Sequence, residues 1–130
     1  MKLNKSNNFL KSEKIKKNLI INKKNSIRDA IIKLNKSGAQ IIFILDDNKR
    51  YIGTITDGDI RRGFIKGKNM NSKVEEIAQK NSLTTFENIN REESLRIMRE
   101  NKISHLPVVN KNKILLGVHF QEKLLSIEEY

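Results

Sequence analysis

Gly53, Thr56 and Asp59 follow one another at intervals of three residues, and each could contact part of a nucleotide. Glycine carries no side chain, so a ligand could approach the backbone at Gly53. Thr56 could present a hydroxyl and helix-start N–H groups to a phosphate, and the Asp59 carboxylate could accept two hydrogen bonds from a ribose diol. Arg61 and Arg62 would add cationic donors nearby. This order of residue types favours a phosphate- and ribose-binding site.

A structural interpretation of the same residues stays open. The spacing of Thr56 and Asp59 is also that of a helix capping box, and Gly53 could simply relieve crowding. From spacing alone the capping interpretation is the better supported one. Arg61 and Arg62 are each more typical of a solvated helix surface than of a phosphate site.

The elements that must position these residues follow from hydrophobic patterning and turn chemistry. We predict a β-α-β-β-α order over the first half of the chain. The first of its two helices starts at a Ser26–Asp29 capping box and stops at Gly38. The five predicted segments are a strand over Leu19–Ile21, a helix over Ile27–Ser37, a hairpin of Gln40–Leu45 with Tyr51–Thr56, and a helix over Asp57–Lys66 that Gly67 ends.

The same order recurs 64 residues later without a gap. Cap, core and turn positions are preserved together in this register. The matching positions are Asn90/Glu93 with Ser26/Asp29, Leu106 with Ile42, Val108 with Ile44, Asn112-Lys113 with Asn48-Lys49, Gly117 with Gly53, and strand Leu83–Phe86 with Leu19–Asn22. A unit of about 60 residues buries little surface by itself. We therefore predict an α+β fold of two such repeats, packed sheet against sheet about an approximate twofold axis with clefts between them.

The predicted domain organisation has five parts. They are a basic tail (1–18) that runs into a short helix over Leu10–Lys17, repeat 1 (19–67), a linker with a short helix over Lys73–Gln79 (68–82), repeat 2 (83–126), and the start of a connection onward (127–130).

The doubled unit, the Gly53–Asp59 segment and the His105–Val109 segment together resemble a tandem pair of cystathionine-β-synthase (CBS) domains, a Bateman module, over Leu19–Ser126. The resemblance implies that Thr56 and Asp59 contact the phosphate and ribose of an adenine nucleotide (AMP, ADP or ATP), which acts as a regulatory ligand rather than a required cofactor. It also implies that the base sits among apolar residues between the sheets.

The second repeat departs from this pattern. Gly117 is retained, but Phe120 stands at the threonine position and Lys123 at the aspartate position. Lysine cannot accept hydrogen bonds from a ribose, and Phe120 would fill the space of a phosphate. We therefore expect at most one site of the usual kind, a cleft that takes an adenine or sugar nucleotide.

The amino-acid sequence of the Thr56–Arg62 segment is similar to that of CBS pairs fused before bacterial sugar-phosphate nucleotidyltransferase domains. Sugar-phosphate isomerases carry similar CBS pairs. The resemblance thus implies the regulatory half of a larger nucleotidyltransferase, with a covalently attached catalytic domain and no catalytic residues in this chain. Apolar surface on the helices Asp57–Lys66 and Phe120–Ser126 predicts a homodimer.

Composition excludes several other classes. The chain has no cysteine, hence no disulfide or thiolate chemistry. Its longest apolar run, Ile41–Leu45, spans five residues, too short for a membrane helix. The start lacks the apolar core of a secretory signal, so we expect a cytoplasmic protein. His105 and His119 have no patterned carboxylate beside them, and no metal site is expected.

Three alternatives to nucleotide binding stay open. A purely structural dimerisation module would explain the loss of the motif from repeat 2. Nucleic-acid binding could use Met1–Lys24, which carries a net charge of +7, but its single aromatic residue makes a solvated tail the better interpretation. An independent enzyme is the least supported, because no nucleophile or acid–base pair stands out.

Overall fold

A computed structural model of the 130-residue chain describes residues 10–11, 18–80 and 82–121. The chain divides into two compact units. The first-repeat unit contains the described residues 18–80 and 82, and the second-repeat unit contains 10–11 and 83–121. Within these residues no helix is long and apolar enough to cross a membrane.

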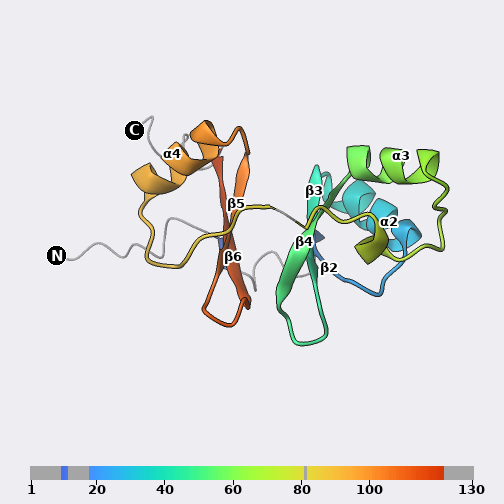
Figure 1. Cartoon of the computed structure of the whole chain (residues 1–130), viewed down its shortest axis with the longest axis horizontal. Helices are drawn as coiled ribbons and strands as arrows, with labels where there is room; N and C mark the ends of the chain where they lie inside the picture. The colour runs from blue at the N-terminus through green and yellow to red at the C-terminus, as the bar shows by residue number, and fades with distance from the viewer. Residues whose placement is uncertain (1–9, 12–17, 81, 122–130) are drawn as a thin grey trace. The chain divides into compact units, whose positions relative to one another are not determined.

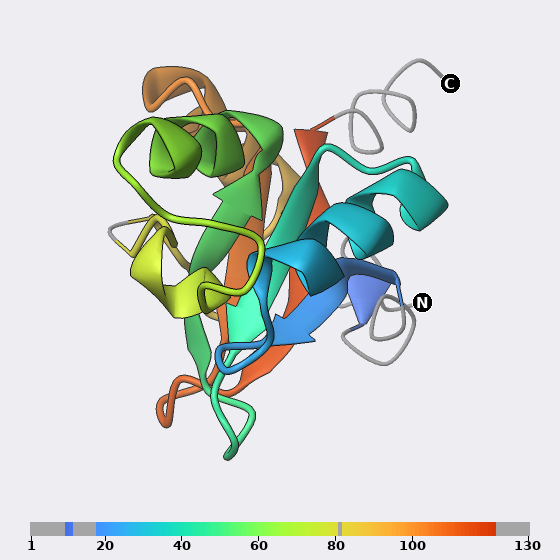
Figure 2. The same cartoon turned by 90° about the vertical axis from the view of Figure 1, so that its right-hand side faces the viewer.

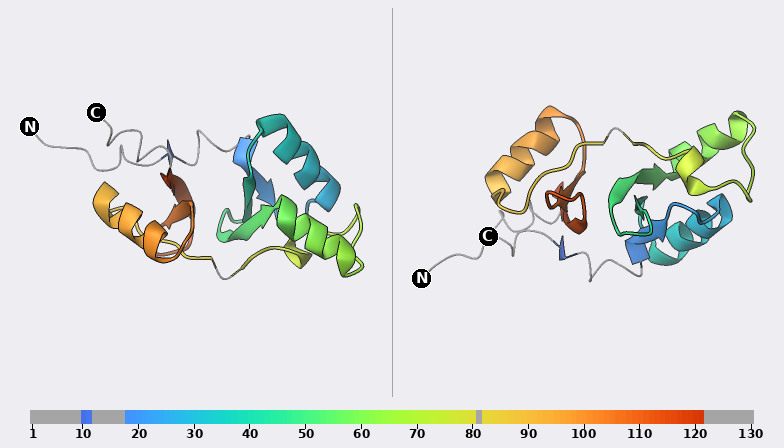
Figure 3. Two further views of the ribbon diagram at one scale, coloured as in Figure 1. Left: turned by 90° about the horizontal axis from the view of Figure 1, so that it is seen from above. Right: turned by 60° about the horizontal axis from the view of Figure 1, so that its bottom comes forward.

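The first-repeat unit has a three-stranded sheet with two helices on one face (Figures 1 and 3). β2 pairs in parallel with β3, and β3 pairs antiparallel with β4, so the sheet order is β2-β3-β4. The elements are β2 (Ile20–Asn22), α2 (Ile27–Ser37), β3 (Ile41–Leu45), β4 (Tyr51–Thr56), α3 (Asp57–Ile65) and the 3₁₀ turn η2 (Val74–Glu76).

Local signals define the ends of α2 as the sequence predicts. Ser26 Oγ accepts a hydrogen bond from the Asp29 N–H, and the Asp29 carboxylate accepts one from the Ser26 N–H, which completes a capping box. Gly38 ends the helix in the left-handed conformation, with φ of 69°. A residue with a Cβ adopts that conformation at a cost, which explains why glycine stands there.

The core of this unit lies between the sheet and its helices. Residues from all three strands, both helices and η2 meet there, so the helix face of the sheet is covered. The buried members are Ile21, Ile27, Ala30, Leu34, Ile42, Ile44, Ile55, Ile60 and Val74. Val74 brings the segment after α3 into this core, and Figure 2 shows η2 below α3.

The second-repeat unit contains β1 (Leu10–Lys11), α4 (Arg91–Glu100), β5 (His105–Val109) and β6 (Leu115–Phe120). Its sheet order is β1-β6-β5, with both pairings antiparallel. α4 lies on one face of the β5–β6 hairpin (Figure 1) and begins at Asn90, whose side chain accepts a hydrogen bond from the Glu93 N–H. Leu95, Met98 and Leu106 form its buried cluster.

The predicted 64-residue register is confirmed by the pairing of the strands. Ile42 pairs with Ile55 and Ile44 with Gly53, while Leu106 pairs with His119 and Val108 with Gly117. Each hairpin has an irregularity at the equivalent step, after Ile44 and after Val108.

The turns and the first strands agree with the same register. Lys49 and Lys113 occupy equivalent turn positions with φ of 66° and 67°. Ile21 pairs in parallel with Ile44, and Thr85 forms a parallel bridge with Val108. The two units therefore have one topology.

Several predicted elements differ from the observed ones. Leu10 and Lys11 form a strand instead of the start of a helix, because they pair with Val118 and Gly117 of β6; residues 12–17 lie outside the described residues. The predicted strand Leu83–Phe86 is reduced to the bridge at Thr85, and the predicted helix Lys73–Gln79 to the short turn η2. Phe120 ends β6, and the rest of the helix predicted over Phe120–Ser126 lies outside the described residues except Gln121.

Ser94→Ala is expected to stabilise the protein by about 1–2 kcal/mol, because a buried hydroxyl without a partner loses its hydration. Ser94 is fully buried in α4, and its Oγ has no hydrogen-bond partner among the described residues. Its equivalent in α2 is the fully buried Ala30. Urea denaturation would measure the difference, and Ala30→Ser should cost a similar amount. A less stable Ser94→Ala protein would contradict the prediction.

Candidate functional site

Thr56 and Asp59 lie together where β4 ends and α3 begins. The Thr56 N–H donates to Asp59 Oδ2 at 2.9 Å, and the Thr56 hydroxyl donates to the same oxygen at 3.0 Å. The Asp59 N–H in turn donates to Thr56 Oγ1 at 3.2 Å. The capping-box interpretation of these two residues is thus confirmed, and it places both at the positive end of the helix dipole.

The second oxygen of Asp59 is also occupied. Arg62 Nη2 donates to Oδ1 at 2.8 Å, and Gln79 Nε2 donates to it at 3.3 Å. The Asp59 residue is only 4% exposed, so its charge is compensated by this local network. A carboxylate offers about four acceptor positions, and Thr56, Arg62 and Gln79 together fill them.

Gly53 serves the chain's own linker. A Cβ at this position would lie 2.2 Å from the Gln79 carbonyl oxygen and 3.0 Å from its carbon. The backbone of Gln79 is held there by two hydrogen bonds with Thr54, of 3.1 and 2.9 Å. The close approach predicted for a ligand at Gly53 is therefore made by the linker in this structure.

The structure brings Thr56, Asp59 and Arg62 into one network, adds Gln79 to it, and leaves Arg61 outside. Arg61 is exposed on α3, as a solvated side chain would be. Gln79 could not be found from the sequence, because it lies 20 residues from Asp59 and belongs to no motif. The antiparallel bridge between Thr54 and Gln79 is what brings it there.

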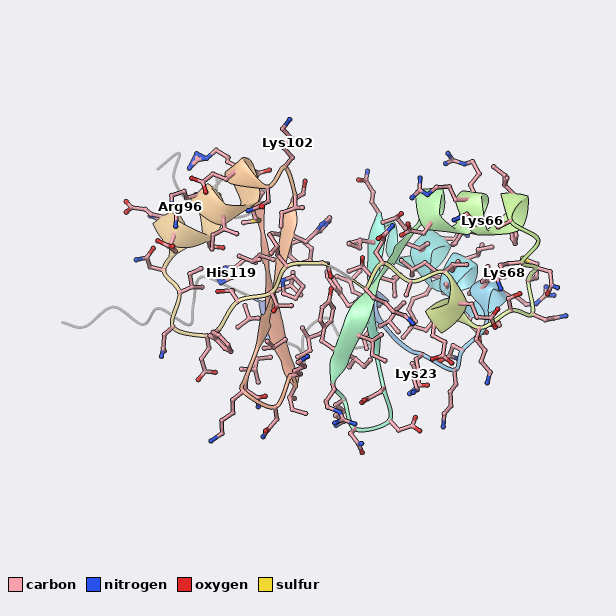
Figure 4. The ribbon with its side chains drawn as sticks, in the orientation of Figure 1. Lys23, Lys66, Lys68, Arg96, Lys102 and His119 are labelled. Carbon is pink, nitrogen blue, oxygen red and sulfur yellow. The ribbon has the colours of Figure 1, made fainter. Side chains whose placement is uncertain are left out.

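A cavity of about 210 Å³ adjoins Asp59 between α3 and the linker. Arg62, Lys66 and Lys68 contribute cations to its lining, and Glu76 contributes a carboxylate. Figure 4 shows Lys66 and Lys68 at the end of α3 and in the segment after it. Lys68 Nζ lies 3.0 Å from Glu76 Oε1, and this hydrogen bond is the main cause that lowers the pKa of Glu76.

The linker is fastened again beyond Gln79. The hydroxyls of Tyr51 and Ser82 are hydrogen-bonded at 2.6 Å. Burial raises the pKa of Tyr51 to about 12, and the bond to Ser82 opposes that rise. The Tyr51 phenol therefore stays protonated at neutral pH.

In repeat 2, Phe120 stands at the position equivalent to Thr56. The rings of Phe120 and His105 meet edge to face, with centroids 5.7 Å apart. Burial lowers the pKa of His105, which favours the neutral imidazole. Lys123 lies outside the described residues. Across the part of the chain that is described, no three His, Cys, Asp or Glu side chains gather as metal ligands would.

Two units of one topology, each with a helix followed by an antiparallel β-hairpin, define a tandem pair of small α+β domains. The chain belongs to the CBS-domain family, which matches it twice, over residues 13–66 and 74–118.

Among its relatives, the arabinose 5-phosphate isomerase KdsD of Yersinia pestis is 30% identical over 100 residues, which cover 76% of this chain and 30% of the isomerase. The chain thus spans less than a third of the length of this curated relative.

Solved structures share the fold. CBSX2 in complex with AMP has a TM-score of 0.79 and 20% identity, and the match covers 95% of this chain and 94% of that one. CbpB in complex with c-di-AMP has a TM-score of 0.80 and 16% identity, with coverages of 95% and 82%. The tandem CBS fold predicted from the sequence is confirmed.

Proposed function

We propose that this chain is a regulatory module that binds an adenine nucleotide at Thr56 and Asp59 of the first repeat. The observation that carries the proposal is the Asp59 carboxylate, held at a helix start in a CBS pair with Thr56 beside it and Arg62 on its second oxygen. In this proposal the ribose diol binds Asp59, the helix-start N–H groups face the phosphate, and Arg62 can leave Asp59 for it. The AMP and c-di-AMP complexes of CBSX2 and CbpB support this choice of ligand class.

We further propose that the module controls a sugar-phosphate isomerase. The similarity to KdsD supports an isomerase as the attached catalytic domain. No relative described above supports the nucleotidyltransferase domain expected from the sequence of the Thr56–Arg62 segment. The chain corresponds to only 30% of KdsD, which leaves room for a catalytic part in such a protein.

We also propose a homodimer. Ile32 of α2 and Phe64 and Ile65 of α3 are large apolar side chains exposed by 49, 41 and 79%. Exposed apolar residues on covering helices are suited to packing against a second copy. The same surface would serve the alternative function, a dimerisation module without a ligand. The capping role of Asp59 and the phenylalanine in repeat 2 favour that alternative.

A thermal-shift titration with AMP, ADP, ATP and c-di-AMP tests the proposal. The nucleotide that binds is expected to stabilise the protein by about 2.7 kcal/mol at 100 times its Kd, because it binds only the folded state. Inorganic phosphate serves as the control for charge alone, and GMP and GTP, which keep the ribose and the phosphates, serve as controls for the adenine base. If no adenine nucleotide raises the melting temperature at millimolar concentration, the structural alternative replaces the proposal.

A further inference from the structure

We propose that Gln79 of the inter-repeat linker competes with the ribose for Asp59 Oδ1, so that nucleotide binding releases the linker side chain from α3. This inference rests on the proposed function and adds to it a residue that sets ribose affinity and couples the site to the linker.

The two oxygens of the Asp59 carboxylate accept hydrogen bonds from different kinds of donor. Oδ2 receives the Thr56 N–H at 2.9 Å and the Thr56 hydroxyl at 3.0 Å, and these two bonds form part of the helix start itself. Oδ1 receives only side chains, Arg62 at 2.8 Å and Gln79 at 3.3 Å. A ribose diol needs two acceptor positions, and those on Oδ1 can be vacated without opening the helix.

Arg62 and Gln79, the two residues whose side chains must leave Asp59 Oδ1, are both exposed. The Arg62 side chain is 61% exposed, so its guanidinium can turn to solvent or to a phosphate. Gln79 makes the longer bond and is an exposed residue, so its amide can exchange Asp59 for water. The ribose must still overcome this bond, and Gln79 therefore lowers the affinity of the free site.

Gln79 belongs to a linker segment that is hydrogen-bonded to β4. Residue 79 pairs through its backbone with Thr54 of β4, and Ser82 is tied to Tyr51 at the start of the same strand. The Gln79 amide adds the bond that ties this segment to α3. Coupling between two binding equilibria is reciprocal. If the Gln79–Asp59 bond weakens ligand binding by a given factor, bound ligand weakens the Gln79–Asp59 bond by the same factor.

The test is calorimetric titration of AMP and 2′,3′-dideoxy-AMP into wild type, Gln79→Met and Gln40→Met. Methionine keeps the length of the side chain but cannot donate. Gln79→Met should bind AMP about two- to tenfold more tightly, because the bond that the ribose must displace is long, at 3.3 Å, and its donor residue is exposed to water. It should show no gain for the dideoxy analogue, which has no diol to place on Oδ1. Gln40→Met, a matched change at an exposed glutamine before β3, should behave as wild type.

A measurement on the wild-type protein tests the inference even if the Gln79→Met variant is unstable. In NMR spectra, the Gln79 side-chain amide protons should exchange faster with water in the AMP complex than in the free protein. The inference is overturned if wild type and Gln79→Met bind AMP with the same affinity. It is also overturned if Gln79→Met gains as much affinity for 2′,3′-dideoxy-AMP as for AMP. Either result leaves the proposed function standing. Failure of every protein to bind AMP or the other adenine nucleotides overturns both.

Discussion

Asp59→Ala is expected to weaken adenine-nucleotide binding by about 1.5–3 kcal/mol, which is the range for hydrogen bonds to a charged acceptor. The carboxylate is the acceptor that the proposal assigns to the ribose diol, and alanine removes both oxygens at once. Calorimetric titration of wild type and variant with the nucleotide found in the thermal screen measures the difference.

The same substitution should also destabilise the fold by about 2–3 kcal/mol, because it removes the Asp59 half of the capping box and a buried charge-assisted network. The Thr56 N–H then loses its acceptor, and the Arg62 guanidinium loses its ion pair. The Ala variant is therefore titrated below its own melting transition, so that affinity and stability are read separately.

Asp57→Ala is the matched control for charge. Asp57 is the first residue of α3 and is exposed, so its loss removes one negative charge near the helix start without touching the Asp59 network. We expect less than about 1 kcal/mol of destabilisation from the lost dipole interaction, and no loss of affinity. If Asp59→Ala binds every active nucleotide as tightly as Asp57→Ala and wild type do, Asp59 is only a cap and the ribose role is wrong.

Gly53→Ala is expected to destabilise the first-repeat unit by about 2–4 kcal/mol, through overpacking and the strain on two backbone hydrogen bonds. The new methyl group would lie 2.2 Å from the Gln79 carbonyl oxygen, and backbone cannot turn aside as a side-chain tip can. The linker must move away from β4, at the expense of its bonds to Thr54. Urea denaturation gives the free energy of unfolding, and exchange of the Thr54 amide reports the linker directly.

Gly58→Ala provides the contrast at a glycine five residues further on. Its Cβ would meet only the tip of the Arg62 side chain, at 3.2 Å, and that side chain can shift. Alanine also favours the helical conformation, so we expect a change between zero and about 1 kcal/mol of added stability. Equal stability of Gly53→Ala and wild type would show that the linker is not held against β4 as described.

The sequence by itself determined the repeated topology and most element boundaries. Ser26 with Asp29, Thr56 with Asp59 and Gly38 are signals that act within one helical turn, so they specify caps whatever the rest of the chain does. The apolar, β-branched strand segments and the turn residues repeated at Lys49 and Lys113 likewise specify each hairpin locally. For this reason the 64-residue register could be predicted, and the strand pairings follow it.

Elements without local signals were predicted less well. Leu10 and Lys11 have no apolar period, and their strand exists because β6 offers Val118 and Gly117 as partners. The segments predicted as a helix over Lys73–Gln79 and a strand over Leu83–Phe86 are shorter than expected, since their conformation depends on distant contacts such as that of Val74 with the core.

The tertiary structure also decided what surrounds the motif. Thr56, Asp59 and Arg62 were identified from spacing, because they share one helix start. That Gln79 shares Asp59 Oδ1, and that its carbonyl lies where a Gly53 side chain would be, depends on a linker returning to β4 over more than 20 residues. Such pairing is made by backbone hydrogen bonds, which do not depend on the type of side chain and therefore leave no signal in the sequence. The proximity of Gln79 and Gly53 is seen only in the folded chain.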